Sequence, residues 1–225
     1  ADTWEYDPET NTWRQMDDFK GGARYYALGF GIDNYGYVGT GYNDNYLKDF
    51  YRFDPTAAAG SQWTIVNGFG GQKRKGATAF VINGKAYVCG GQNNNSDVSD
   101  FWRFDPSAAT PWTQLRDIAN TSDDDYDDDY TSIVRSYGVS FVIDGKAYLT
   151  LGSTAGGSYY SNYWIYDPET DLWEGDDLTA FEGSTRIHAV CFSTGTRGII
   201  ATGGSGSSSY FDDTWELKPY EYEEE

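Results

Sequence analysis

The feature that most constrains the fold of this 225-residue chain is a short acidic and aromatic segment that recurs five times. The copies are DTWEYDP (2–8), DFYRFDP (49–55), DFWRFDP (100–106), NYWIYDP (162–168) and DTWELKP (213–219). Their closing prolines are spaced 47, 51, 62 and 51 residues apart. A strand-rich repeat near 50 residues indicates a repeat architecture, because each unit buries its apolar face only against its neighbours.

We call each recurring segment that ends in proline a proline box. The residues around each proline box predict a four-stranded unit. The first strand follows an arginine, and it leads through a hairpin turn into a second strand that ends in glycine. The turns are clearest at Asn83-Gly84 and Asp144-Gly145, because these residues tolerate the positive φ of a two-residue hairpin turn. The proline-box strand and a short strand with tryptophan complete the unit. The tryptophans are Trp13, Trp63, Trp112 and Trp173. We therefore predict an all-β radial array of antiparallel sheets.

The glycines after the second strand, the aromatic residue before Asp-Pro and the downstream tryptophan resemble kelch repeats over the whole chain. The arginine-led strand and the FWRFDP box are most similar to kelch proteins of bacterial cell surfaces and periplasms. The resemblance implies a kelch-type β-propeller, with four full blades plus a half blade. The paired glycines read Gly90-Gly91 and Gly203-Gly204, but Gly39-Thr40-Gly41 and Gly152-Ser153 elsewhere. Because Thr and Ser are small, we expect the tight packing to survive.

We interpret residues 1–225 as a single domain. The repeat units are approximately 1–20, 21–70, 71–120, 130–180 and 183–225. The first unit is only half a blade, and an open ring would expose sheet edges and a blade face. Since kelch propellers usually have six or seven blades, we expect further residues upstream of Ala1. The alternative is a five-bladed ring whose half blade is completed by residues 220–225.

The charge balance restricts the partners. The chain has 16 Lys and Arg against 35 Asp and Glu, a formal net charge of −19. This acidity argues against a nucleic-acid or anionic-membrane partner. No apolar run approaches the 18 residues of a membrane span. We expect an extracytoplasmic location (periplasmic, cell-surface or secreted), which is compatible with a leader or lipid anchor upstream.

The arginines that begin the first strands are the first candidate site. They are Arg24, Arg74, Arg135 and Arg186. In a propeller the first strand lies nearest the axis, so the four guanidinium groups could ring the channel mouth and bind a carboxylate, a sulfate or an acidic peptide. The structural alternative is that each arginine pairs with an acidic box residue or loop carbonyls. Neighbouring residues that differ between repeats would tune a site there, and these are Tyr25, Tyr26, Lys75, Tyr137, Ile187 and His188.

An acidic insertion, DDDYDDD at 123–129, explains the 62-residue spacing. A run of like charges predicts a solvated, flexible loop. The alternatives are protein docking or a calcium site built from Asp123, Asp125, Asp127 and Asp129, because Ca²⁺ prefers several carboxylate oxygens. The spacing does not match an EF-hand loop.

His188 is the only histidine, so the chain cannot build a histidine-rich zinc or copper site. This excludes a copper radical oxidase of the galactose-oxidase type. We predict that His188 is a packed or channel-lining residue without a catalytic role. We also expect no cofactor, and we expect Cys89 and Cys191 to be thiols rather than a disulfide.

Four loops should crown one face of the propeller: 42–46, 92–99, 152–163 (with Tyr159 and Tyr160) and 205–211. Their Tyr, Ser, Gly and Asn content suits adaptable recognition. We predict a non-catalytic, extracytoplasmic protein-binding module of a bacterium, able to act in a larger complex. One alternative is carbohydrate binding at the same loops. The other is an enzyme similar to bacterial kelch propellers that epimerise sialic acids with Arg and Glu near the axis, although the first strands here carry almost no acids.

Overall fold

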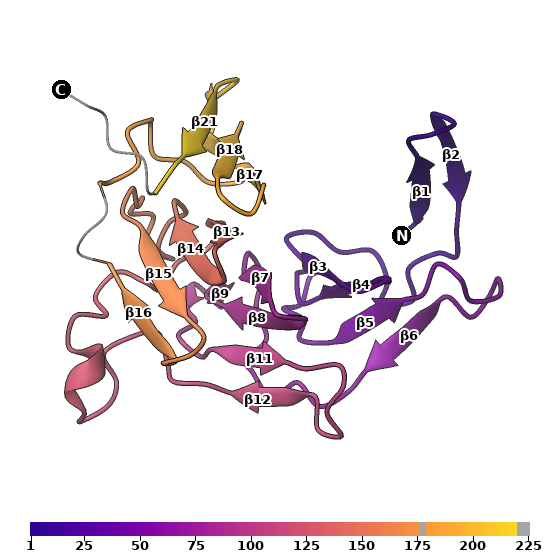
Figure 1. Cartoon of the computed structure of the whole chain (residues 1–225), viewed down its shortest axis with the longest axis horizontal. Coiled ribbons are helices and arrows are strands. Elements are labelled where there is room, and N and C mark those ends of the chain that lie inside the picture. Colours follow the sequence, from indigo (N-terminus) through magenta and orange to yellow (C-terminus); the bar gives the residue numbers. More distant parts are fainter. Residues whose placement is uncertain (176–178, 220–225) are drawn as a thin grey trace.

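The computed structural model describes residues 1–175 and 179–219, and in them the chain forms an arc of antiparallel sheets around one axis (Figure 1). The predicted all-β propeller arrangement is confirmed. Helical structure in this part of the chain is limited to one 3₁₀ turn, η1 (Asp125–Asp127). No helix among the described residues is long and apolar enough to cross a membrane.

Each blade follows the same strand order, with the first strand innermost. Blade one contains β3 (Leu28–Ile32), β4 (Tyr35–Gly39), β5 (Phe50–Phe53) and β6 (Trp63–Val66). Blade two contains β7 (Thr78–Ile82), β8 (Lys85–Cys89), β11 (Trp102–Phe104) and β12 (Trp112–Gln114). Blade three contains β13 (Val139–Ile143), β14 (Lys146–Thr150), β15 (Trp164–Asp167) and β16 (Leu172–Glu174). Blade four contains β17 (Val190–Ser193), β18 (Gly198–Ala201) and β21 (Thr214–Leu217). The half blade contains β1 (Trp4–Asp7) and β2 (Thr12–Gln15).

The predicted hairpin turns have the expected geometry. Asn83 and Gly84 have φ of 50° and 71°, and Asp144 and Gly145 have φ of 49° and 78°. These turns set Ile82 opposite Lys85 and Ile143 opposite Lys146. Their fixed register lets side chains of the first and second strands alternate between the two faces of each blade.

Apolar side chains fill the three junctions between consecutive blades. Aromatic rings dominate them, as in the contacts of Phe50 with Trp112 (4.7 Å between ring centroids) and Phe101 with Tyr166 (4.9 Å). The fourth-strand tryptophans Trp63, Trp112 and Trp173 are all buried. Cys89 and Cys191 are free thiols, as predicted, and burial raises the pKa of Cys89 to about 12.

One backbone hydrogen bond recurs at each junction. The N–H of Gly41, Gly91 and Gly152 donates to the carbonyl of the arginine of the next blade, at 2.8, 2.8 and 3.0 Å. The alignment of the glycine pairs therefore differs from the expected one. In blades three and four the position equivalent to Gly90 lies one residue earlier in the sequence than predicted. Gly90-Gly91 corresponds to Thr40-Gly41, Leu151-Gly152 and Thr202-Gly203. Its first position accepts side chains as large as leucine, whereas its second is glycine in every blade, at φ of +86° to +96°.

The two ends of the arc leave apolar positions uncovered. Val190 and Phe192 of β17 are 58% and 57% exposed, whereas the equivalent Val139 and Phe141 of β13 are buried beneath the next blade. Trp13 of the half blade is 65% exposed, unlike the tryptophans of the complete blades. Figure 1 shows these ends, β1–β2 and β17–β18–β21, on either side of a gap. The need for further upstream residues stays a prediction, and the alternative closing segment 220–225 lies outside the described residues.

Candidate functional site

The four arginines form internal clamps with one repeated geometry. Each Nε donates to the carbonyl two residues earlier, and each Nη1 donates to the carbonyl sixteen residues later. The third partner of each arginine is the first side chain of the recurring proline-ended segment. It is Asp49 for Arg24, Asp100 for Arg74, Asn162 for Arg135 and Asp213 for Arg186. Arg74, Arg135 and Arg186 are at most 1% exposed, and the Arg24 side chain is 3% exposed.

These positions correct the expectation of an anion-binding ring. The donors of the guanidinium groups are directed at carbonyl and carboxylate oxygens inside their own blades, so the groups do not face the channel mouth. The arrangement matches the structural alternative, in which each arginine pairs with a box side chain and with loop carbonyls. It anchors the turn that leads into each first strand, and so it holds the residues after each arginine at the axis.

Arg135 differs from the other three because its box partner is the neutral Asn162. Its Nη2 donates to Asn162 Oδ1 at 3.1 Å, and its remaining donors reach backbone carbonyls. Burial lowers the pKa of Arg135 to about 10. In blade four, by contrast, hydrogen bonds led by that from Arg186 lower the pKa of Asp213 to about 2. Within the described part of the chain, blade three therefore holds a buried cation that no carboxylate neutralises.

The Asn162→Asp variant is expected to raise the free energy of unfolding by about 1–2 kcal/mol, because it converts a neutral hydrogen bond into a charge-assisted one. Urea unfolding measures the change. Since a carboxylate in this setting has a lowered pKa, the gain should be present above about pH 4 and fade as the pH falls toward that of Asp213. The reverse exchange, Asp100→Asn in blade two, should destabilise. A less stable Asn162→Asp variant would contradict the assignment.

The residues two positions after the arginines converge on the axis. They are Tyr26, Gly76, Tyr137 and His188, with φ of 56°, 65°, 59° and 59°. Backbone bonds join the first three, since Gly76 N–H donates to Tyr26 O (2.9 Å) and Tyr137 N–H donates to Gly76 O (2.8 Å). Glycine adopts this left-handed conformation without strain, whereas an aromatic residue there costs about 1 kcal/mol or more. Three blades nevertheless place an aromatic ring at this position.

Aromatic rings from three blades touch one another there. Tyr26 of blade one stacks on His188 of blade four (5.1 Å between centroids, 10° between planes) and meets Tyr137 of blade three at 5.0 Å. Tyr137 and His188 are 4.5 Å apart. Tyr25 extends the contact from Tyr26 to Tyr42, which in turn meets Tyr46. Tyr25 and Tyr26 are 53% and 41% exposed, and His188 is exposed, so this surface is open to solvent.

The amino group of Lys75 lies among these rings. Its Nζ is 5.2, 5.5 and 5.8 Å from the ring centroids of Tyr42, Tyr46 and Tyr26. A cation over aromatic faces is held by the ring quadrupole. We call this set the axial cluster, and it comprises Tyr25, Tyr26, Tyr42, Tyr46, Lys75, Tyr137 and His188.

Sequence reasoning singled out five members of the axial cluster and missed two. Tyr25, Tyr26, Lys75, Tyr137 and His188 were identified by their places beside the arginines. Tyr42 and Tyr46 join through the crown loop 42–46, whose backbone pairs with Tyr25 through reciprocal hydrogen bonds of 3.1 and 2.9 Å. The sequence signal that could have identified them is the pair of tyrosines at the two ends of this loop.

Tyr159 and Tyr160 belong to the crown but have other contacts. The Tyr159 hydroxyl accepts the Gly206 N–H (2.8 Å), which ties the loop of blade three to that of blade four. The Tyr160 ring covers the guanidinium of Arg135 at 4.7 Å. Asp97 accepts the Ala155 N–H (2.7 Å), and burial outweighs this bond and raises its pKa. The crown loops therefore brace one another around the axial cluster.

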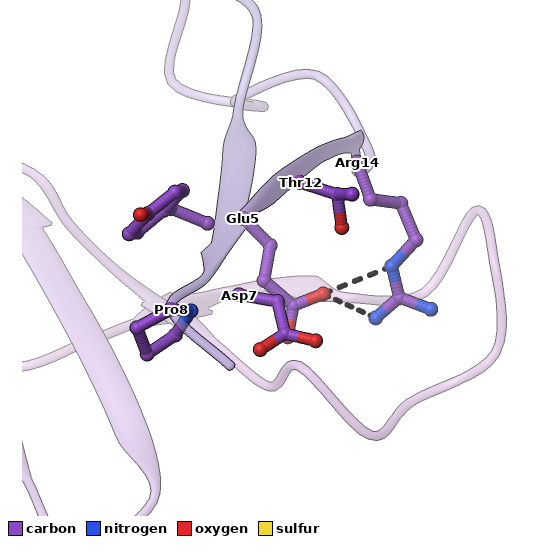
Figure 2. A pocket seen from close by; sticks show the side chains of 6 residues that line it. Glu5, Asp7, Pro8, Thr12 and Arg14 are labelled. Atoms are coloured by element: carbon purple, nitrogen blue, oxygen red, sulfur yellow. Dashed lines mark hydrogen bonds and ion pairs between the residues drawn. The ribbon is translucent and has the colours of Figure 1, made fainter. Parts of the chain in front are cut away.

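Two surface hollows accompany these features. One, of about 440 Å³, adjoins the axial cluster at His188 and is lined mainly by Ile187, Thr202, Gly203, Tyr210 and Phe211. The other, of about 510 Å³, lies on the half blade (Figure 2). There Arg14 Nε donates to Glu5 Oε2 at 2.9 Å, so its one cation is already paired, and Asp7 adds a second carboxylate. Only the first hollow extends the axial site.

The acidic insertion is more ordered than predicted. Asp127 is buried and accepts hydrogen bonds from the Thr121 and Ser122 backbone and the Ser122 hydroxyl, at 2.9 to 3.0 Å. Burial alone would raise the Asp127 pKa, but these bonds outweigh it and lower the pKa. Asp123, Asp125 and Asp129 are exposed and solvated, as predicted. The calcium alternative is unsupported, because within 1–175 and 179–219 no three His, Cys, Asp or Glu side chains converge as metal ligands.

Comparison with known proteins agrees with the fold. Residues 73–115 match the Kelch motif, and this range encloses the strands of blade two. The solved structure of YjhT superposes with a TM-score of 0.78 at 14% identity, covering 98% of this chain and 73% of that chain, which shows the fold alone.

Curated relatives match over shorter stretches. The N-acetylneuraminate epimerase of Yersinia enterocolitica is 34% identical over 97 residues, which are 40% of this chain and 24% of the relative. That of Shigella sonnei is 31% identical over 108 residues, 46% of this chain and 26% of the relative. Kelch-like protein 15 of Danio rerio is 26% identical over 178 residues, 76% of this chain and 29% of the relative. The chain thus spans less than a third of each curated relative.

Proposed function

Because the chain is a kelch-repeat β-propeller, we propose that it is a non-catalytic binding module that holds a protein partner on its axial face. The observation that carries this proposal is the axial cluster, an exposed aromatic surface built at strained backbone positions. Backbone strain of this kind is kept at functional sites more often than elsewhere. Tyrosine also supplies a large contact area at a low cost in side-chain entropy, which suits protein recognition.

The surrounding crown supports a protein partner over a small ligand. The loops carry polar Asn, Ser and Tyr side chains around the aromatic centre, which is the usual layout of an interface with a polar rim. The hollow beside His188 is open and offers one place for an inserted side chain. We extend the proposal to an extracytoplasmic location on the basis of the acidic surface and the resemblance to surface kelch proteins.

A retention experiment tests the proposed function. The immobilised chain, the Tyr26→Ser/Tyr137→Ser variant and an Ile65→Ser control are exposed to an extract of the source cells, and retained proteins are quantified by mass spectrometry. Ile65 is 56% exposed on β6, so its variant removes a similar apolar surface away from the axis. We expect a partner that the wild type and the control retain and that the double variant loses by about tenfold or more. A partner that binds all three equally would refute axial recognition.

The second candidate function is the binding or conversion of an acidic sugar. It is favoured by the names of the two epimerase relatives and by the Lys75 ammonium among tyrosine rings. The test follows the interconversion of the epimers of N-acetylneuraminate by proton NMR. We expect no acceleration over the uncatalysed rate. An acceleration that the Tyr26→Ser/Tyr137→Ser variant abolishes would replace the non-catalytic proposal.

A further inference from the structure

We propose that the axial cluster binds a carboxylate, and that the Lys75 ammonium is the group that holds it. This inference rests on the proposed function and deepens it, since it assigns the partner an acidic side chain or chain end at the axis. It differs from the arginine ring expected from the sequence, because the buried guanidinium groups are already paired within the blades.

Lys75 is held in place while its charge stays available. Its backbone is fixed to the crown, since its N–H donates to Gln92 O (3.1 Å) and its carbonyl accepts Gln92 N–H (3.0 Å). Its Nζ rests over Tyr26, Tyr42 and Tyr46. Aromatic rings stabilise an ammonium without neutralising it. Among the described residues, no carboxylate oxygen lies within ion-pair distance of this nitrogen.

Several other cations of this acidic chain do have a carboxylate partner. Acidic residues outnumber basic ones by 35 to 16. Three of the four buried arginines pair with an aspartate, and Lys85 and Lys146 pair with Asp105 and Asp167. The axial lysine is a half-buried cation without such a pair, and the tyrosines beside it form an exposed surface.

The other polar groups of the axial cluster suit a monoanion. The Tyr137 hydroxyl accepts a hydrogen bond from Gln92 Nε2 (3.4 Å), which leaves its own proton to donate. Burial lowers the pKa of His188, so its ring is neutral near pH 7 and can donate through one N–H. One full positive charge in a cluster whose other donors are neutral matches a carboxylate better than a dianionic phosphate, and it repels a basic side chain.

The test uses N-acetylglycine as a monocarboxylate probe and N-acetylglycinamide as its neutral analogue. Binding to the full chain is followed by the NMR shifts of the tyrosine and histidine rings at about 0.15 M salt, where the field of distant acids is screened. We expect N-acetylglycine to shift the axial rings and to bind about tenfold more tightly than the amide. Lys75→Gln should abolish this preference and Lys75→Arg should keep it. Lys85→Gln, which removes an outer lysine, should leave it unchanged.

Several outcomes would overturn the inference, and they differ from failure of the proposed function. Equal binding of the acid and the amide, a preference that survives in Lys75→Gln, or absence of any ring shift each refutes the carboxylate site. If a protein partner requires Tyr26 and Tyr137 but binds Lys75→Gln normally, the binding module stands and the carboxylate inference fails. If N-acetylglycine binds at Lys75 but no partner is retained, the site stands and the proposed function fails.

Discussion

The Arg74→Leu variant is expected to lose about 3–5 kcal/mol of folding free energy, the usual cost of removing one member of a buried ion pair. The guanidinium of Arg74 is fully buried and donates to Asp100 and to the carbonyls of Gln72 and Gly90. Leucine fills part of the volume but removes the donors to these acceptors. The buried Asp100 carboxylate keeps the Gln72 N–H (2.9 Å) but loses its positive partner, which is the largest part of the cost. The midpoint of urea unfolding measures the loss.

The matched control is Arg14→Leu. Arg14 also pairs with a carboxylate, that of Glu5, but its side chain is 67% exposed. Water replaces such a partner readily, so the change should be within about 1 kcal/mol. If both variants lost the same free energy, the clamp would not depend on burial, and our account of the arginines would be wrong.

The clamp also makes a functional prediction. Because Arg74 anchors the turn before Lys75 and Gly76, its loss should loosen the axial cluster as well as the fold. The tyrosine ring signals of an Arg74→Leu sample that is still folded at low temperature should broaden or shift. Those of Arg14→Leu should not.

The Gly152→Ala variant is expected to lose about 3 kcal/mol or more, because an added Cβ meets backbone that cannot move away. The Cβ would lie 2.6 Å from Ser136 O and 2.8 Å from Gly138 N, and the residue has φ of +86°. Its N–H also carries the junction bond to Arg186 of the next blade. Thermal unfolding of the variant measures the loss.

Gly145→Ala isolates the conformational part of that cost. Gly145 has a similar φ of +78°, but a Cβ there meets nothing within 4 Å. Only the left-handed backbone then disfavours alanine, by about 1 kcal/mol. A Gly145→Ala variant as unstable as Gly152→Ala would show that close packing at the junction contributes little.

Much of the fold could be predicted from local sequence features. The hairpins at Asn83-Gly84 and Asp144-Gly145 follow from turn chemistry, which depends on two residues. The strand order of each blade follows from the spacing of the proline boxes. The predicted site was less complete, since it included Tyr26, Lys75, Tyr137 and His188 but left open whether the arginines bind a ligand or pair within the blades. The local sequence around an arginine does not reveal whether its side chain is exposed at a turn or folded back into its blade.

The glycine register shows where repeat alignment reaches its limit. Gly203-Gly204 matches Gly90-Gly91 in residue type, but the structure aligns Gly90 with Thr202 and Leu151. Identity at one position cannot decide this, because the relevant constraint is the approach of the next blade's backbone to Gly41, Gly91, Gly152 and, by equivalence, Gly203. That constraint involves residues 33 to 44 positions apart, such as Gly41 with Arg74 and Gly91 with Arg135.

The repeat, the all-β blades and the hairpin turns follow from local sequence, because they depend on short-range periodicity and on the φ that single residues tolerate. The three-dimensional structure was needed to show that the arginines are internal clamps, that the box partner of Arg135 is the neutral Asn162, and that rings from blades one, three and four meet in the cluster that contains Lys75. The physical reason is that contact across the axis depends on the angles at which whole blades pack. Those angles are set by many side chains together, and no local pattern encodes them.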